Sequence, residues 1–203
     1  MSIVTDIVEN RGLVEIICDG VTVARVRKAH YAKCPLEVGE DVDSEAWMDR
    51  VAAVQFADCY EAALSSLDFC ARSAKGIGGS LQRRGYVEPC VRAVVARLTE
   101  NRLIDDARYA ERLAETQVSK PVGVYQIRRK LRAKGISEED AEAALAAFDD
   151  EQQRGAALAA AQRLYRKYEA LPPREARAKL SQALARRGFA WDTIESAIEE
   201  LMD

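Results

Sequence analysis

A pattern centred on glycine occurs three times in this sequence, at Gly85, Gly135 and Gly188. Each glycine follows a basic residue and precedes a large apolar residue. Apolar residues also lie four and eight positions before each glycine, and 6, 9, 10 and 13 positions after it. The glycines are 50 and 53 residues apart. A period of that length is typical of a repeat architecture, in which one supersecondary unit is copied and stacked.

The spacing of the apolar residues predicts the structure of one repeat. The positions after the glycine follow the i, i+3, i+4, i+7 series of one helix face, and the pair before it marks a preceding helix. The glycine lies just past that helix, where a left-handed backbone is common and glycine has no Cβ penalty. A further apolar-periodic stretch precedes each pair, starting near Phe56, Ala107 and Leu158. Each repeat therefore has about three helices in roughly 50 residues.

Capping, glycine and aromatic residues add detail to these helices. Ser137 and Asp192 are predicted N-caps of the last helices in the second and third repeats. Three glycines lie inside the expected second helix of the first repeat and predict a frayed start for it: Gly76, Gly78 and Gly79. Four aromatic residues lie at or near repeat-core positions and are predicted to pack inside rather than to stack on bases: Tyr86, Phe148, Phe189 and Trp191.

The N-terminal segment has a different pattern. Residues 3–27 contain three short β-rich apolar runs, separated by Asn10-Arg11-Gly12 and by Asp19-Gly20. An Asp-Gly pair between apolar runs is a strong hairpin signal, so we expect a small antiparallel sheet or hairpin. Residues 33–43 are predicted to be a connector, and Ser44 is a candidate cap for the helix that follows.

These patterns together predict a mainly α fold: an elongated tandem array of three three-helix repeats with a small β-rich N-terminal extension. The expected boundaries are 1–43 for the extension and connector, 44–104 for the first repeat, 105–150 for the second and 151–203 for the third.

The residue inventory argues against an enzyme. The sequence has no phosphate-binding loop, no dinucleotide glycine fingerprint, no G-x-S-x-G and no H-E-x-x-H motif. With one histidine and five cysteines that form no C-x-x-C pair, we expect no metal, no cofactor and reduced cytosolic thiols. We see neither a secretory signal nor an apolar run of about 20 residues, so we expect a cytoplasmic protein that does not contact a membrane.

The charge is unevenly distributed along the chain. The formal net charge is −3, but residues 71–135 carry 15 basic and 6 acidic side chains, or +9, between acidic flanks of −7 and −5. The basic residues crowd the second helix of the second and third repeats: Arg128, Arg129, Lys130, Arg132, Lys134, Arg186 and Arg187. Cations near a helix C-terminus also interact favourably with its carbonyls, so a solvated helix face is the alternative to a binding surface. A binding surface of this kind suits either DNA phosphate or an acidic protein surface.

Asp105 and Asp106 form the most conspicuous acidic pair. We interpret them as the N-terminal cap of the helix that follows, because adjacent carboxylates bind a metal only with further converging ligands. An acidic contact to a partner is the alternative.

Three stretches of the sequence resemble the RecX family, the bacterial regulators of the RecA recombinase. They are Leu103-Ile104-Asp105-Asp106-Ala107-Arg108-Tyr109-Ala110, then Ile127 through Ile136, then Arg186-Arg187-Gly188-Phe189. The resemblance covers about residues 56–203, and the β-rich N-terminus is similar to an extension found in some members.

The resemblance implies a cytoplasmic, non-enzymatic protein that binds RecA or its filament on single-stranded DNA. Such proteins inhibit recombinase activity, ATP hydrolysis and filament growth, and some contact single- or double-stranded DNA directly. A monomer suits binding in the filament groove. The implied partner-binding residues are Asp105, Asp106, Arg108, Arg128, Arg129, Lys130, Arg132, Lys134, Arg186 and Arg187. A sequence-tolerant DNA-binding helical protein is the competing hypothesis from the residues alone, since three-helix units with glycine turns share features with helix-turn-helix modules.

Overall fold

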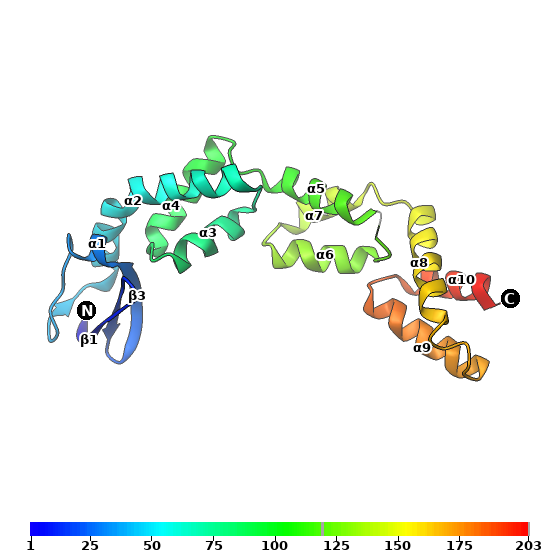
Figure 1. The fold of residues 1–203 in the computed structure, drawn as a ribbon. Coiled ribbons are helices and arrows are strands. Elements are labelled where there is room, and N and C mark those ends of the chain that lie inside the picture. Colours follow the sequence, from blue (N-terminus) through cyan, green and yellow to red (C-terminus); the bar gives the residue numbers. More distant parts are fainter. Residues whose placement is uncertain (119, 203) are drawn as a thin grey trace. The chain divides into compact units, whose positions relative to one another are not determined.

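The computed structural model describes residues 1–118 and 120–202 and forms two compact units, Met1–Asp105 and Asp106–Asp203 (Figure 1). The elements of the first unit are β1 Ser2–Asn10, β2 Leu13–Cys18, β3 Val21–Arg27, α1 Lys28–Tyr31, β4 Asp41–Val42, α2 Ser44–Phe69, α3 Ala74–Arg83 and α4 Glu88–Glu100. Those of the second unit are α5 Asp106–Val118, α6 Val124–Ala133, α7 Glu138–Leu145, α8 Asp150–Tyr165, α9 Pro173–Arg186 and α10 Trp191–Met202. The prediction of a mainly helical fold with a small N-terminal sheet is confirmed.

The N-terminal sheet is antiparallel, with the strand order β3-β2-β1-β4. Both tight turns have left-handed backbone: Arg11 and Asp19 each have φ 49°, and each precedes a glycine with φ 79°. Two consecutive positive φ angles are what a two-residue hairpin turn needs, which explains the predicted hairpins. The prediction that residues 33–43 form a connector was partly wrong, because Asp41 and Val42 pair with Ile3 and Ser2 as the fourth strand. A strand of two residues is too short to show the alternation of apolar and polar residues by which strands are recognised in a sequence.

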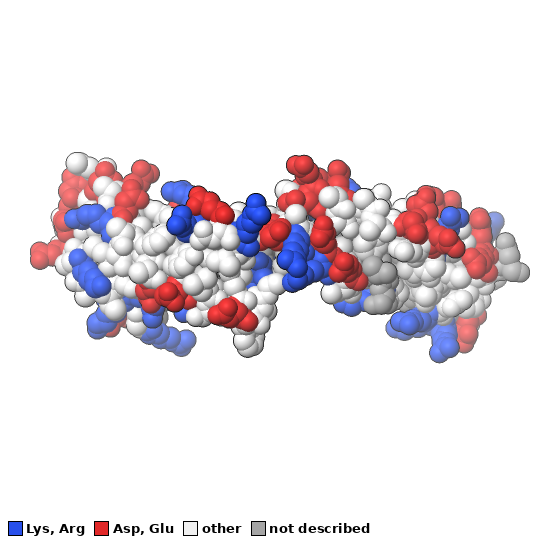
Figure 2. All heavy atoms as spheres, turned by 90° about the horizontal axis from the view of Figure 1, so that it is seen from above, with Lys and Arg blue, Asp and Glu red and all other residues white. Residues whose placement is uncertain are grey.

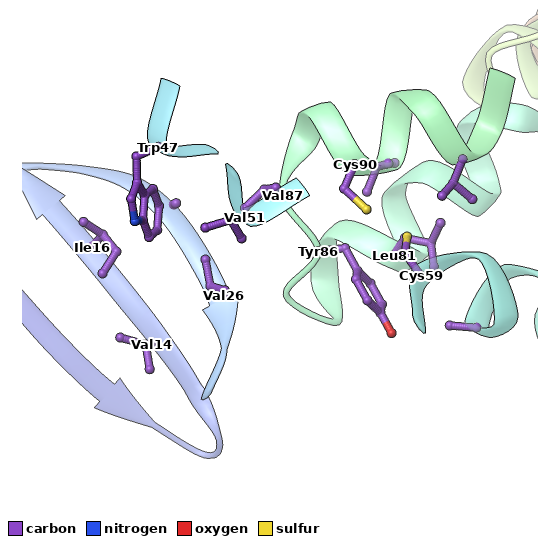
Figure 3. Close-up of a cluster of buried hydrophobic side chains, with 14 of the residues drawn as sticks. Val14, Ile16, Val26, Trp47, Val51, Cys59, Leu81, Tyr86, Val87 and Cys90 are labelled. Carbon is purple, nitrogen blue, oxygen red and sulfur yellow. The ribbon is translucent and has the colours of Figure 1, made fainter. Parts of the chain in front are cut away.

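One long helix, α2, covers the sheet. Its N-cap is Asp43, whose side chain accepts hydrogen bonds from the N–H groups of Glu45 and Ala46. Ser44, the expected cap, is instead the first helical residue. Trp47 and Val51 of α2 face three buried strand residues, Val14, Ile16 and Val26 (Figure 3). The same helix continues into the first three-helix repeat, so extension and repeat share one core.

The three repeat glycines have the predicted left-handed backbone. Their φ angles are 86° at Gly85, 81° at Gly135 and 80° at Gly188. In each case the N–H of the next residue donates a hydrogen bond back to the carbonyl of the leucine four positions before the glycine, at 3.2 to 3.4 Å. These bonds close the helix end and return the chain onto it. The large apolar residue after each glycine is accordingly buried: Tyr86, Ile136 and Phe189.

Other local predictions had mixed outcomes. Ser137 caps α7 as predicted, since its hydroxyl accepts a hydrogen bond from the Asp140 N–H at 3.0 Å. The first-repeat glycines do not fray α3, which runs unbroken from a Ser73 cap. Asp192 is not a cap, because α10 begins one residue earlier and, among the described residues, the Asp192 carboxylate accepts hydrogen bonds from the neighbouring Thr193 alone.

Trp191 contradicts the expectation that it packs in the core. It is the first residue of α10, and 63% of its surface is exposed. The buried face of α10 begins only at Ile194. The other three aromatic residues follow the prediction, with Tyr86 and Phe189 buried and Phe148 packed at the edge of its core.

A polar network fastens the sheet to the first glycine turn. Gln55 of α2 is fully buried and donates from Nε2 to the Gly85 carbonyl at 2.9 Å, while its Oε1 accepts from the Val87 N–H at 2.8 Å. The Gly85 carbonyl also accepts from the Arg27 N–H at 3.3 Å. Because a buried amide needs partners for both its ends, this network fixes where β3, α2 and the turn meet.

Asp58 is the central residue of the charged part of the same network. Its Oδ2 atom lies 2.7 Å from Arg27 Nη1 and 3.4 Å from His30 Nε2, and it accepts a 2.7 Å hydrogen bond from the Tyr86 hydroxyl. The Tyr86 bond, with help from Arg27 and His30, holds the pKa of Asp58 below its usual value. Burial lowers the pKa of His30 more than Asp58 raises it. Burial and the Asp58 bond raise the pKa of Tyr86 to about 12.

We expect the first unit to lose stability on acidification from about pH 7.5 to about pH 5.5. Unfolded His30 takes up a proton near pH 6.5, whereas the folded protein resists protonation down to a lower pH. The unfolded state therefore binds more protons in this window, and the free energy of unfolding decreases as the pH is lowered. Urea unfolding followed by Trp47 fluorescence in a Trp191→Phe background measures it. The additional change His30→Gln should flatten the pH slope, and an unaltered slope would contradict the assignment to His30.

Candidate partner-binding surface

The basic residues of the second repeat lie on α6. Ile127 and Leu131 of this helix are fully buried in the repeat core. The residues between and beside them therefore point toward the helix flanks and solvent, and four of these are cations: Arg128, Arg129, Lys130 and Arg132. The helix is ten residues, or about 15 Å, long.

Three of the four cations already have partners within the second repeat. Arg128 lies 3.3 Å from Glu138 and 4.0 Å from Glu142, and Arg132 lies 3.0 Å from Glu138. Both carboxylates come from the adjacent helix α7. Lys130 donates to the side-chain oxygen of Gln117 of α5 at 2.8 Å. Exposed ion pairs of this kind contribute about 0–1 kcal/mol each, so a partner could displace them at little cost.

Three predicted cations have no side-chain hydrogen bond or ion pair with any described residue: Arg129, Arg186 and Arg187. Arg129 is exposed on α6, and Arg186 is the last residue of α9. Arg187 and Gly188 form the turn after α9, and this turn contacts the N-terminal end of α6. Lys134 ends α6 at its opposite end. The predicted cations of the second and third repeats thus lie along the whole of α6 and at the neighbouring turn, and do not form a single compact cluster.

The predicted acidic residues lie at the beginning of α5. Asp105 directly precedes this helix, and Asp106 is its first residue. Carboxylates there face the positive end of the helix dipole, which agrees with the interpretation as capping residues. Arg108, in the first turn of the same helix, is exposed.

A backbone junction joins the second and third repeats, and sequence reasoning missed it. The Gly123 N–H donates to the Arg187 carbonyl at 2.9 Å, and the Tyr125 N–H donates to the Gly188 carbonyl at 3.1 Å. A Cβ atom at Gly123 would overlap the carbonyl of Gly188, and one at Gly188 would overlap the backbone of Gln126. The two backbones can approach this closely only where both residues are glycine.

Charged side chains of both signs lie on the visible face of each unit, among larger areas of uncharged residues (Figure 2). Figure 2 shows basic and acidic side chains interspersed there, with no broad area of one sign. Among the described residues, no group of three or more His, Cys, Asp or Glu side chains is placed to hold a metal ion. In the same part of the chain, no helix has both the length and the apolar composition needed to cross a membrane. The fold and this surface define a protein of tandem three-helix repeats with a mixed-charge surface.

Comparisons with known proteins place this architecture in a family. The family models described as "RecX, second three-helix domain" and "RecX, third three-helix domain" match residues 105–145 and 150–198. The chain is 29% identical over 195 residues to the "Regulatory protein RecX" of Limosilactobacillus reuteri (strain DSM 20016), covering 96% of this chain and 74% of that protein. It is 35% identical over 149 residues to the protein of the same name from Streptococcus pneumoniae (strain Hungary19A-6), covering 72% and 57%.

A solved structure agrees with these matches. The crystal structure of a regulatory protein RecX superposes with a TM-score of 0.70 at 28% identity, covering 98% of this chain and all of that one. The chain belongs to the RecX family. Its relatives are named as regulators and not as enzymes.

Proposed function

We propose that this protein binds the RecA recombinase, or its filament on single-stranded DNA, and inhibits recombinase activity, ATP hydrolysis and filament growth. It would do so in the cytoplasm and without catalysing a reaction. The observation that carries the proposal is the presence of two matched RecX three-helix domains in a chain that follows a RecX crystal structure over nearly its whole length.

The repeat construction supports a mechanism for such inhibition. A filament presents the same surface on each of its subunits, so repeats of one chain can bind neighbouring subunits at once. The second contact is then effectively intramolecular, and the total affinity exceeds that of either repeat alone. A protein that fits one filament geometry better than others also shifts the filament toward that geometry. Subunit addition that requires another geometry would slow.

The test is single-stranded-DNA-dependent ATP hydrolysis by the cognate RecA. The purified protein should slow hydrolysis at substoichiometric ratio and shorten filaments seen by electron microscopy. Unchanged hydrolysis and unchanged filament length would refute the proposal. Tight binding to naked single- or double-stranded DNA, with a steep salt dependence and no effect on RecA, would favour the DNA-binding alternative.

Arg129 gives the sharpest mutational prediction for the second-repeat surface. Replacing Arg129 with Glu should raise the protein concentration needed for half-inhibition by about tenfold, because reversal of an exposed and unpaired charge weakens attraction to a complementary surface. The matched control is Arg112→Glu on α5, since Arg112 is also exposed and has no side-chain partner among the described residues. If both variants inhibit as wild type does, the α6 face is only solvated surface.

A further inference from the structure

A groove of about 260 Å³ lies between α8 and the residues that precede α6. Its floor is apolar and is made of Pro121 on one side and of Gly155, Ala156 and Ala159 of α8 on the other. The side of α8 that carries Ala157, Ala160 and Ala161 is buried in the third-repeat core. The groove lies on another side of the helix, and Ala156 is at the border between the two.

The groove is hollow because the side chains along it are small. Gly155 has no Cβ, and open space surrounds the position that such an atom would occupy. Next to this wall, the first residue of α6 is tied to α8 by a hydrogen bond from the Val124 N–H to the side-chain oxygen of Gln153, at 3.2 Å. The groove is therefore built from two elements of the second unit that are fixed to one another.

Cations line the groove beside its apolar floor. Lys120 belongs to the wall that precedes α6, and Arg163 belongs to the last turn of α8. Neither side chain forms an ion pair or hydrogen bond with any residue the structure describes. Arg128 and Arg132 of α6 differ from them in having carboxylate partners already. Both side chains are exposed, so their charge is available to an anionic ligand from outside the chain.

The combination of floor and cations selects the class of ligand. A sugar–phosphate backbone would match Lys120 and Arg163 but would leave the alanine floor without an apolar partner. An amphipathic peptide satisfies both, because its small apolar side chains cover the floor while its carboxylates reach the cations. From Gly155 to Arg163 the helix α8 rises about 12 Å, so a helical ligand of two to three turns would cover the floor.

We propose that this groove is a binding site for an acidic, amphipathic helical segment of a partner protein. The site is separate from the α6 cations. Under the proposed function, on which this assignment of a partner rests, the segment would belong to the recombinase. The groove itself can be tested without that assumption.

The test uses the full chain and a fluorescein-labelled synthetic helical peptide with a stripe of alanine and leucine flanked by glutamates. Fluorescence anisotropy should give a Kd at least fivefold lower for this peptide than for a version with lysine at the glutamate positions. The variant Lys120→Glu/Arg163→Glu should reverse that preference. Equal binding of the two peptides, no binding, or a preference unchanged by the charge reversal would overturn the proposal.

A second variant guards against a folding defect in the double mutant. Ala159→Gln places a polar side chain over the floor without changing any charge, and we expect it to weaken binding of the acidic peptide at least threefold. Ala178→Gln, on an exposed site of α9, is the matched control and should bind as wild type does. Equal affinities of these two variants would also contradict the proposal.

The link to the recombinase has its own readout. Excess acidic peptide should relieve inhibition of ATP hydrolysis if the groove holds a recombinase segment. Persistent inhibition in the presence of bound peptide would refute that link and leave the groove to another partner. Failure of the wild-type protein to inhibit at all would count against the proposed function alone.

Discussion

Replacing Gly123 with alanine should lower the free energy of unfolding of the second unit by about 2–5 kcal/mol, one of the two largest effects we expect from a single substitution. The added Cβ would overlap the Gly188 carbonyl, which is a backbone atom that cannot rotate away. The two repeats must separate to make room, and the hydrogen bonds donated by the Gly123 and Tyr125 N–H groups are then lost. Gly123 does not have a positive φ, so the cost comes from close approach and not from backbone strain.

Urea unfolding measures the loss, and amide hydrogen exchange locates it. The Tyr125 N–H should exchange faster in the variant, because its acceptor has moved. The matched control is Gly155→Ala, in a helix where open space surrounds the new methyl group. That change should stabilise the protein by about 0.5–1 kcal/mol, because alanine favours the helix more than glycine does. If the two variants behave alike, the glycine contact does not hold the repeats together.

The parts of the fold that were predicted correctly have short-range causes. Gly85, Gly135 and Gly188 lie at helix ends, where the chain reverses over a few residues, and periodic apolar positions before and after them define each hairpin. Ser137 was identified as a cap for the same reason, because its hydroxyl accepts a hydrogen bond from the N–H of Asp140, only three residues further along the chain. Local patterns of this kind can be read without knowing what the segment packs against.

The errors have long-range causes. Asp41 and Val42 become a strand only because β1 lies beside them. Trp191 is apolar and next to a periodic face, but the direction of its side chain depends on where α10 starts. Gly123 gains its importance from a turn 65 residues later in the chain, and no local pattern indicates which segments will meet.

The candidate binding surface was predicted in part for the same reason. The sequence identified the cations of α6, and it also contained the carboxylates of α7. It could not indicate that the glycine turn places Glu138 between Arg128 and Arg132 and thereby compensates both. Counting charges overestimates a binding surface wherever neighbouring helices supply the counterions. Arg129 can be recognised as the α6 cation without a described partner only when those ion pairs are known.

Leu131→Ala should have an effect as large as that of the glycine change, with a loss of about 2–5 kcal/mol in the free energy of unfolding. Leu131 is fully buried in the core of the second repeat. Its truncation leaves a cavity that the surrounding helices can close only partly. The loss would come from the interior of one repeat, whereas the Gly123 loss would come from the contact between two repeats.

The two changes can therefore be separated in one experiment. Hydrogen exchange in Leu131→Ala should rise throughout α5, α6 and α7, whereas in Gly123→Ala the rise should centre on the beginning of α6 and the turn after α9. The control for the first change is Leu103→Ala, the same truncation at a residue that is 48% exposed, which should cost less than about 1 kcal/mol. If Leu131→Ala cost no more than this control, α6 would not be anchored by its apolar face, and the orientation of its cations toward a partner would lose its physical basis.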